Sequence, residues 1–272
     1  MASITVQYID HMGTDLSVVN AARVSFDKES GWVQRPFAPG VEDLTLLDEE
    51  LPSQCIAYED YPRAFDDQGR ELSGFMLSRK DQKLIEYLAK HNHKSPFNHC
   101  FATFRVKAPI FVARQLVKHE YMPWNEVSRR YVDSEPEFYI PDTWRKKADN
   151  VKQGSSDETI DFIDFNFEDI NTGRQLPQLE LVSEVVNNLN RHALHIYETM
   201  IEKGVCAEQA RMCLPQSTMT TWIWSGSLFA IAKMCKLRLD PNTQYETRLV
   251  AQPIAEMMAE LFPVSWKALM DV

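Results

Sequence analysis

Apolar residues recur along the chain in patterns that predict strands and helices in alternation. Ile4, Val6 and Tyr8 alternate with polar neighbours, which predicts a half-buried opening strand. After a turn at Gly13, Thr14 or Asp15 can cap a helix. The apolar positions of that helix have the required three-to-four spacing: Leu16, Val19, Ala22 and Val24.

The middle of the chain predicts two more helices and a strand. Ser78 and Asp81 form the pattern of a capping box, and the helix that follows has the apolar face Leu84, Ile85, Leu88 and Ala89. Residues 101–108 alternate as in a strand, and Pro109 suits the first position of the next helix. That helix carries Ile110, Ala113, Leu116 and Val117.

The second half of the chain predicts a long helix that Gly204 ends. Its apolar face comprises Val182, Val185, Val186, Leu189, Ala193, Ile196, Tyr197 and Met200. Two further helical stretches are expected around residues 221–235 and 251–261. Residues of about 27–77 and 151–180 are polar, acidic and without a sustained period, so we interpret them as two insertions in a single domain spanning 1–272.

Composition restricts the class of protein. A chain with 44% hydrophobic and 25% charged residues is ordinary for a soluble domain, and its apolar runs are far shorter than the roughly 20 residues of a membrane span. The N-terminus lacks a signal pattern, so we expect a cytoplasmic protein without a membrane partner. The net charge of −10 disfavours nucleic acid as a partner.

The charge is nevertheless uneven. Residues 101–131 hold six Lys/Arg against two acids, which favours a small anionic ligand. Within this region the string RQLVKHEYMPWNEVSRRY, residues 114–131, combines cations, amides, a serine and aromatic residues. Arg and Lys can bind a phosphate, and Gln115, Asn125 and Ser128 can hydrogen-bond a planar base. A solvated basic helix followed by a polar loop is the alternative interpretation.

Other candidate sites are weaker. The string HNHKSPFNH, residues 91–99, suggests zinc, but it has no obvious fourth ligand and contains Pro96, so we predict no metal. The five cysteines lack a CxxC pair and are interpreted as small buried hydrophobes. Arg211 and Arg238 lie among apolar residues, where a structural ion pair is the usual role of an arginine. The chain has neither a Walker loop nor GxGxxG, and no cysteine in a Pro-Cys-His setting.

Several strings together resemble the flavin-dependent thymidylate synthases, the ThyX family. The family signature RHRxxSxNExSxRY is similar to KHEYMPWNEVSRRY, residues 118–131. Further blocks in family order are MGTDLSVVNAARVSF (12–26), LIEYLAKHNHKSPFNH (84–99), VKAPIFVARQ (106–115), EFYIP (137–141), ARMCLP (210–215) and LRLDPNTQYE (237–246). The resemblance covers most of the chain outside the two insertions.

The resemblance implies an α/β (α+β) ThyX-like fold, with a central, mainly antiparallel sheet flanked by helices. It implies a homotetramer with active sites at subunit interfaces. It also implies FAD as cofactor, NADPH and methylenetetrahydrofolate as co-substrates, and conversion of dUMP to dTMP. The flavin, rather than a protein nucleophile, would then mediate the transfer.

The family's functional residues carry over position by position. Arg238 would be catalytic, because it would face the pyrimidine carbonyl and stabilise charge on the ring. The substrate-binding set would be Gln115, Lys118, Ser128, Arg130, Arg211 and Arg238. The cofactor-binding set would be Ser25, His93, Ser95, His119, Glu120, Tyr121, Asn125, Glu126, Lys233 and Asn242.

The chain departs from the family at several of these positions. Lys118 and Glu120 replace the two arginines of RHR, and Pro123 replaces its serine. On the flavin side the unusual residues are Asn98, Ser227, Phe229, Lys233 and Asn242. One hypothesis is a rebuilt flavin site with Lys233 on the FAD phosphates. Another is altered chemistry, giving a flavin-dependent hydroxymethylase of dUMP or dCMP; a non-catalytic nucleotide-binding homologue is the third.

Overall fold

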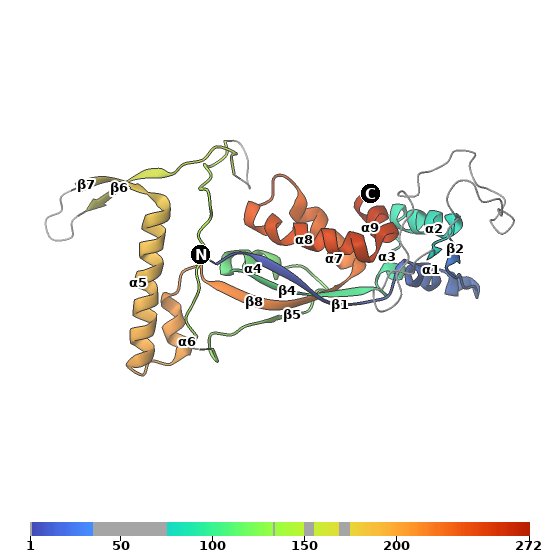
Figure 1. Cartoon of the computed structure of the whole chain (residues 1–272), viewed down its shortest axis with the longest axis horizontal. Helices are drawn as coiled ribbons and strands as arrows, with labels where there is room; N and C mark the ends of the chain where they lie inside the picture. The colour runs from blue at the N-terminus through green and yellow to red at the C-terminus, as the bar shows by residue number, and fades with distance from the viewer. Residues whose placement is uncertain (1, 35–74, 133, 150–154, 169–174) are drawn as a thin grey trace. The chain divides into compact units, whose positions relative to one another are not determined.

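A computed structural model describes residues 2–34, 75–132, 134–149, 155–168 and 175–272 (Figure 1). Its central element is an antiparallel four-stranded sheet with the strand order β1-β4-β8-β5. The strands are β1 (Thr5–Met12), β4 (Phe101–Pro109), β5 (Trp124–Glu126) and β8 (Met219–Ser227). Sheet and helices together confirm the predicted mixed fold.

The helices agree with the predicted pattern in most places. They are α1 (Asp15–Arg23), α2 (Arg79–Lys90), α3 (Lys94–Phe97), α4 (Ile110–Leu116), α5 (Val182–Glu202), α6 (Ala207–Ala210), α7 (Leu228–Leu239), α8 (Tyr245–Leu261) and α9 (Pro263–Met270), with 3-10 turns at Val24–Phe26 and Arg211–Cys213. Ser78 caps α2 as predicted, since its hydroxyl oxygen accepts the Asp81 N–H at 3.1 Å, but the Asp81 carboxylate accepts the Ser78 hydroxyl at 2.8 Å rather than completing a capping box. Gly204, just beyond α5, has φ = 86°, a conformation that glycine adopts without steric cost.

The prediction of a helix from residue 221 is wrong. Residues 221–227 belong to strand β8 and not to a helix, and only α7 from Leu228 is helical. Burial alternates along β8, with Trp222 and Trp224 fully buried between half-buried neighbours. Thr, Ile and Trp are strand-favouring residues, and this alternation has a period of two. The final helices were also incompletely predicted, because α8 begins at Tyr245 and α9 was missed.

The described residues form two compact units, each made of segments that are distant in the sequence. The first comprises Met1–Tyr8, Phe104–Trp224 and Met234–Pro253, and the second comprises Ile9–Thr103, Ser225–Lys233 and Ile254–Val272. Each segment of the second unit is followed or preceded by one of the first, so the chain passes repeatedly between them. The single domain over 1–272 stays a prediction.

The second unit packs short helices together. Helix α2 packs on α9, and α1 packs on α2, α3 and α9. The buried Asp15 carboxylate accepts the N–H groups of Val264 and Ser265 at 2.9 and 2.8 Å, which satisfies the first turn of α9. Burial raises the pKa of Asp15, because it disfavours the charged carboxylate. The hydrogen bonds from Val264 and Ser265 act in the opposite direction and offset part of that desolvation cost.

The two predicted insertions differ in what the structure describes. Residues 35–74 of the first lie outside the described residues, but strands β2 (Val33–Gln34) and β3 (Phe75–Met76) pair at its two ends. The second contains a hairpin, β6 (Phe162–Glu168) paired with β7 (Gln175–Leu181), where a loop was expected. The hairpin leads directly into α5 (Figure 1).

Two other expectations need correction. The Cys100 and Cys235 thiols are buried, as expected, but Cys206 is exposed at the start of α6 and Cys213 is half-buried; Cys55 lies outside the described residues. The apolar face of α5 is only partly covered, since Leu189 is 58% exposed. Among the described helices, none has the length and hydropathy needed to cross a membrane.

Candidate functional site

Three tryptophans fix strand β5 against β8 and so position the loop that follows. Trp124 pairs with Trp224 in the antiparallel register. Its ring stacks on Trp222 at 4.4 Å between centroids and meets Trp224 edge-on at 5.7 Å. Each such aromatic pair contributes about 0.5–1.5 kcal/mol beyond the area it buries. The three-residue strand β5 is therefore held by side chains as well as by its short ladder.

The loop after β5 forms one wall of a pocket of about 430 Å³ in the first unit. This volume lies within the range of small-molecule sites. The pocket is lined from the start of α4, the loop after β5, the 3-10 turn after α6 and the start of β8. Its lining residues are Ile110, Glu126, Val127, Ser128, Arg129, Arg130, Arg211, Leu214, Thr218, Met219 and Thr220.

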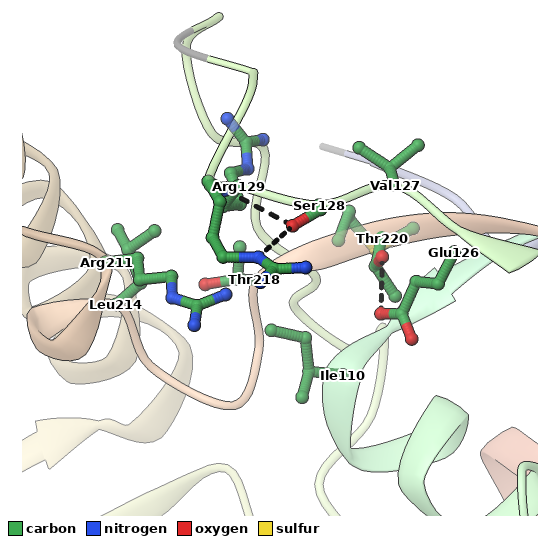
Figure 2. A pocket seen from close by; sticks show the side chains of 11 residues that line it. Ile110, Glu126, Val127, Ser128, Arg129, Arg211, Leu214, Thr218 and Thr220 are labelled. Carbon is green, nitrogen blue, oxygen red and sulfur yellow. Dashed lines mark hydrogen bonds between the residues drawn. The ribbon is translucent and has the colours of Figure 1, made fainter. Parts of the chain in front are cut away.

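The pocket unites three residues predicted for substrate binding: Ser128, Arg130 and Arg211. Arg130 donates its Nε–H to the Ser128 hydroxyl oxygen at 3.2 Å, and Arg211 donates its Nε–H to the Glu208 carbonyl at 3.2 Å. Figure 2 shows the Arg211 guanidinium reaching into the pocket from the side opposite Glu126. Within the described part of the chain, neither arginine forms an ion pair, so both charges are available to an anion.

Glu126 is the one carboxylate of the pocket lining, and both of its oxygens are held. One accepts the Thr220 hydroxyl at 2.8 Å (Figure 2). The other accepts the Trp124 indole N–H at 3.1 Å. Glu126 was predicted for the cofactor, yet it shares a pocket with the predicted phosphate-binding residues. Three arginines against one glutamate leave this pocket net positive.

A second arginine-centred group lies at the other end of α4. Arg238 donates its Nε–H to His119 Nε2 at 2.9 Å and one Nη2–H to the Gln115 carbonyl at 3.3 Å. The Gln115 side-chain oxygen in turn accepts the hydroxyl of Thr247. We call these four residues, Gln115, His119, Arg238 and Thr247, the Arg238 cluster.

Arg238 in this cluster is half-buried, and desolvation lowers the pKa of its guanidinium. The guanidinium still carries its charge at neutral pH, because arginine is effectively always protonated. His119 Nε2 acts as the acceptor, so that nitrogen carries no proton in this arrangement. The cluster therefore presents a fixed, directed cation.

Helix α4 connects the two groups. Ile110 at its first position lines the pocket, and Gln115 near its last position belongs to the Arg238 cluster. With a rise of about 1.5 Å per residue, these positions are roughly 7.5 Å apart along the helix axis. Of the residues predicted for the site, the structure thus places Ser128, Arg130 and Arg211 at one end of α4, and Gln115, His119 and Arg238 at the other.

Several predicted residues of the first unit lie outside both groups. Lys118 is exposed beyond α4 and does not line the pocket. Glu120, Tyr121 and Asn125 are exposed as well. The exposed Asn242 side chain donates to the Asp240 carboxylate at 3.0 Å. Their roles toward substrate or cofactor remain predictions.

The remaining predicted cofactor residues belong to the second unit. Ser25, His93, Ser95 and Lys233 are all exposed. Three of the unusual positions in this unit make contacts of their own. The Ser227 hydroxyl donates to Asn98 Oδ1 at 2.7 Å, and Lys94 Nζ lies 5.5 Å from the centre of the Phe229 ring. Asn98 and Ser227 depart from the family pattern together and are direct partners.

The structure adds residues that the sequence argument missed. Arg129, Thr218 and Thr220 line the pocket, and Thr247 completes the Arg238 cluster. Arg129 lies within the family motif, but Thr218 and Thr220 lie at the start of β8, most of which was predicted as a helix. The signal that would have found them is the alternation of TMTTWIWSGS. Within the described ranges, no group of three or more His, Cys, Asp or Glu side chains is placed to hold a metal.

Comparisons with known proteins find relatives that match nearly the whole chain. A protein of Thermus thermophilus named flavin-dependent thymidylate synthase is 32% identical over 97% of this chain and 74% of its own length. One of Thermotoga neapolitana with the same name is also 32% identical, over 97% of this chain and 89% of its own length.

Among solved structures, the UMP/dUMP methylase PolB from Streptomyces cacaoi, bound with 5-Br dUMP, is similar. Its TM-score is 0.66 at 26% identity, over 99% of this chain and 96% of that one. The family profile described as "Thymidylate synthase complementing protein" (Thy1) matches residues 7–264. With nearly the whole sequence matched, this chain belongs to the Thy1 (ThyX) family.

Proposed function

We propose that the chain is a flavin-dependent thymidylate synthase that converts dUMP to dTMP. Methylenetetrahydrofolate would donate the one-carbon unit, and NADPH-reduced FAD would be the hydride source. The observation that carries this proposal is the pairing of an arginine–serine pocket with the Arg238 cluster along one helix. The names of the curated relatives support it.

The pocket suits the phosphate of a nucleoside monophosphate. Arg130 and Arg211 bring charge without a competing ion pair among the described residues, and Arg130 already orients the Ser128 hydroxyl. Charge-assisted hydrogen bonds of this kind contribute about 1.5–3 kcal/mol each. Glu126 would accept a hydroxyl of the sugar, since its own two protein partners fix its oxygens in place.

Arg238 would act on the pyrimidine ring. Two of its five N–H groups are used within the cluster, and the others remain for a ligand. Negative charge must build up on the ring carbonyl for C5 to become nucleophilic, and that electron density forms the new C–C bond when C5 attacks the one-carbon unit. A partly desolvated guanidinium, held from two sides, stabilises such charge better than a mobile one.

The residues present fit a flavin dinucleotide. His93 and Ser95 offer exposed polar groups, Lys233 offers an exposed cation to a diphosphate, and Phe229 adds an aromatic ring beside Lys94. FAD, when bound, supplies the hydride that completes the methyl group. The chain's own contribution would be to bind the cofactor, orient the nucleotide and balance its charge.

A homotetramer with sites at subunit interfaces belongs to the proposal. Large apolar side chains next to the pocket residues support it: Tyr131 is 80% exposed and Met212 is 81% exposed. Exposed apolar groups beside a site are typical of surfaces that a partner covers.

The test is anaerobic turnover with FAD, NADPH and methylenetetrahydrofolate, offering dUMP, UMP or dCMP, with the product identified by mass. We expect dTMP from dUMP. A hydroxymethyl product would contradict methyl transfer and favour the hydroxymethylase hypothesis. Nucleotide binding without any product, or purified protein that takes up no flavin, would favour the non-catalytic homologue.

A further inference from the structure

Thr247 carries a buried hydroxyl that joins helix α8 to Gln115. It lies in the first turn of α8 and is fully buried. Its hydroxyl donates to the side-chain oxygen of Gln115, on α4. Gln115 is therefore the hydrogen-bond partner of this buried hydroxyl.

This hydrogen bond determines what Gln115 can offer to a ligand. A glutamine side chain ends in one acceptor oxygen and one NH₂ donor, and the two exchange places when the amide rotates. Here the oxygen is occupied by Thr247, so the NH₂ group points elsewhere. Rotation would leave the hydroxyl proton of the fully buried Thr247 without this acceptor, which is costly because water does not reach Thr247.

Arg238 adds further N–H donors beside those of Gln115. Its Nη2 group donates to the Gln115 backbone carbonyl, so the two side chains belong to the same cluster. Arginine has donors and no acceptor. Gln115 and Arg238 therefore present only N–H groups, and a ligand at this point must supply acceptors.

We propose that Thr247 is a positioning residue that makes the site select uracil over cytosine. Uracil has a carbonyl oxygen at C4, where cytosine has an amino group. A Gln115 NH₂ that faces C4 hydrogen-bonds the uracil oxygen and opposes the cytosine donor. A site built to hydrogen-bond one group discriminates strongly against an analogue that leaves it unpaired. This inference rests on the proposed function, that the chain binds a pyrimidine nucleotide.

The test compares dUMP and dCMP affinities of the full-length protein by calorimetry, without turnover. The variants are Thr247→Val, which removes the hydroxyl at similar volume, and Thr247→Ser, which keeps it. We expect the wild type to prefer dUMP. Thr247→Val should lower the dUMP-to-dCMP affinity ratio about tenfold, the effect of one hydrogen bond, and Thr247→Ser should retain it.

The outcomes separate this inference from the proposed function. If Thr247→Val weakens both nucleotides equally, its role is purely structural and the inference is overturned while the proposed function stands. A wild type that prefers dCMP also overturns it. If the wild type binds neither nucleotide, the proposed function fails first and the inference with it.

A second variant keeps the test decisive if Thr247→Val does not fold. Gln115→Glu replaces the NH₂ donor with an acceptor at nearly the same size. The expected result is a larger loss of affinity for dUMP than for dCMP. Equal losses for the two nucleotides would overturn the assignment of Gln115 as a donor to C4.

Discussion

The arginine–serine pocket and the Arg238 cluster use the same side chain in different surroundings. In the pocket, Arg130 and Arg211 are exposed, and each makes one hydrogen bond at its Nε. In the cluster, Arg238 is half-buried, with two hydrogen bonds and a pKa lowered by desolvation. Both belong to the first compact unit and both touch α4.

The difference indicates a division of labour. Exposed charges attract an anion over a distance, but salt screens them, with a Debye length of about 8 Å at physiological ionic strength. A half-buried guanidinium held by two hydrogen bonds attracts a distant anion less, but its remaining N–H groups have a fixed orientation. We therefore expect the pocket to determine how tightly a nucleotide binds, and the Arg238 cluster to determine which base is bound and how fast it reacts.

The largest effect should come from Arg238→Ala. Removal of a preorganised donor to a developing negative charge typically costs about 10²–10³ in rate. We expect dUMP-dependent turnover to fall by at least about 100-fold, while FAD stays bound. Turnover at saturating dUMP, together with flavin absorbance of the purified variant, measures both.

Arg238→Lys sharpens this experiment. Lysine keeps the charge but lacks the planar fork that lets Arg238 contact His119 and Gln115 at once. Its activity should lie between that of the wild type and Arg238→Ala. Near-normal turnover in Arg238→Ala would refute the catalytic role of Arg238.

The next effect in size is expected at the pocket. Arg211→Ala removes a charge-assisted contact of about 1.5–3 kcal/mol, so dUMP affinity should fall roughly 10- to 100-fold. Turnover at saturating dUMP should be largely retained. The salt dependence of dUMP binding should also weaken, because one of the screened charges is gone. Calorimetric titrations at low and high salt provide the measurement.

Arg191→Ala is the matched control, since Arg191 is an exposed arginine on α5 away from the pocket lining. It should leave both affinity and salt dependence unchanged. If Arg211→Ala instead lowers turnover at saturating dUMP as much as Arg238→Ala does, the two regions share one task and the division of labour is wrong.

The same comparison shows what the sequence reveals in advance. The pocket residues Ser128 and Arg130 are close in sequence, so a motif identifies them together, and local chain geometry brings them into contact. Thr247 is 132 positions from its partner Gln115 and has no local signal. Its function appears only when α8 is packed against α4, which is a tertiary contact.

The wrong prediction for residues 221–227 has a related cause. Apolar residues dominate this stretch and the next, so a short apolar run does not distinguish a buried strand from a buried helix. The strand-favouring Thr, Ile and Trp residues of β8 and their pairing with β5 decide the matter. Helices with clear caps and polar faces, such as α1 and α2, were predicted nearly to their ends.

The smallest effect is expected for Lys233→Ala, which separates the nucleotide side from the flavin side. Lys233 is an exposed cation on α7 in the second unit, and exposed contacts of this kind contribute about 0.2–1 kcal/mol. We expect FAD affinity to fall a few-fold, while dUMP affinity stays unchanged. Fluorescence titration of the apoprotein with FAD measures this, with Lys267→Ala as the control because Lys267 is an exposed lysine on α9.

Unchanged FAD affinity in Lys233→Ala would show that the cofactor phosphates are held elsewhere. A loss of dUMP affinity instead would mean that the flavin and nucleotide sides are coupled, and the pocket and the Arg238 cluster would then no longer account for nucleotide binding by themselves.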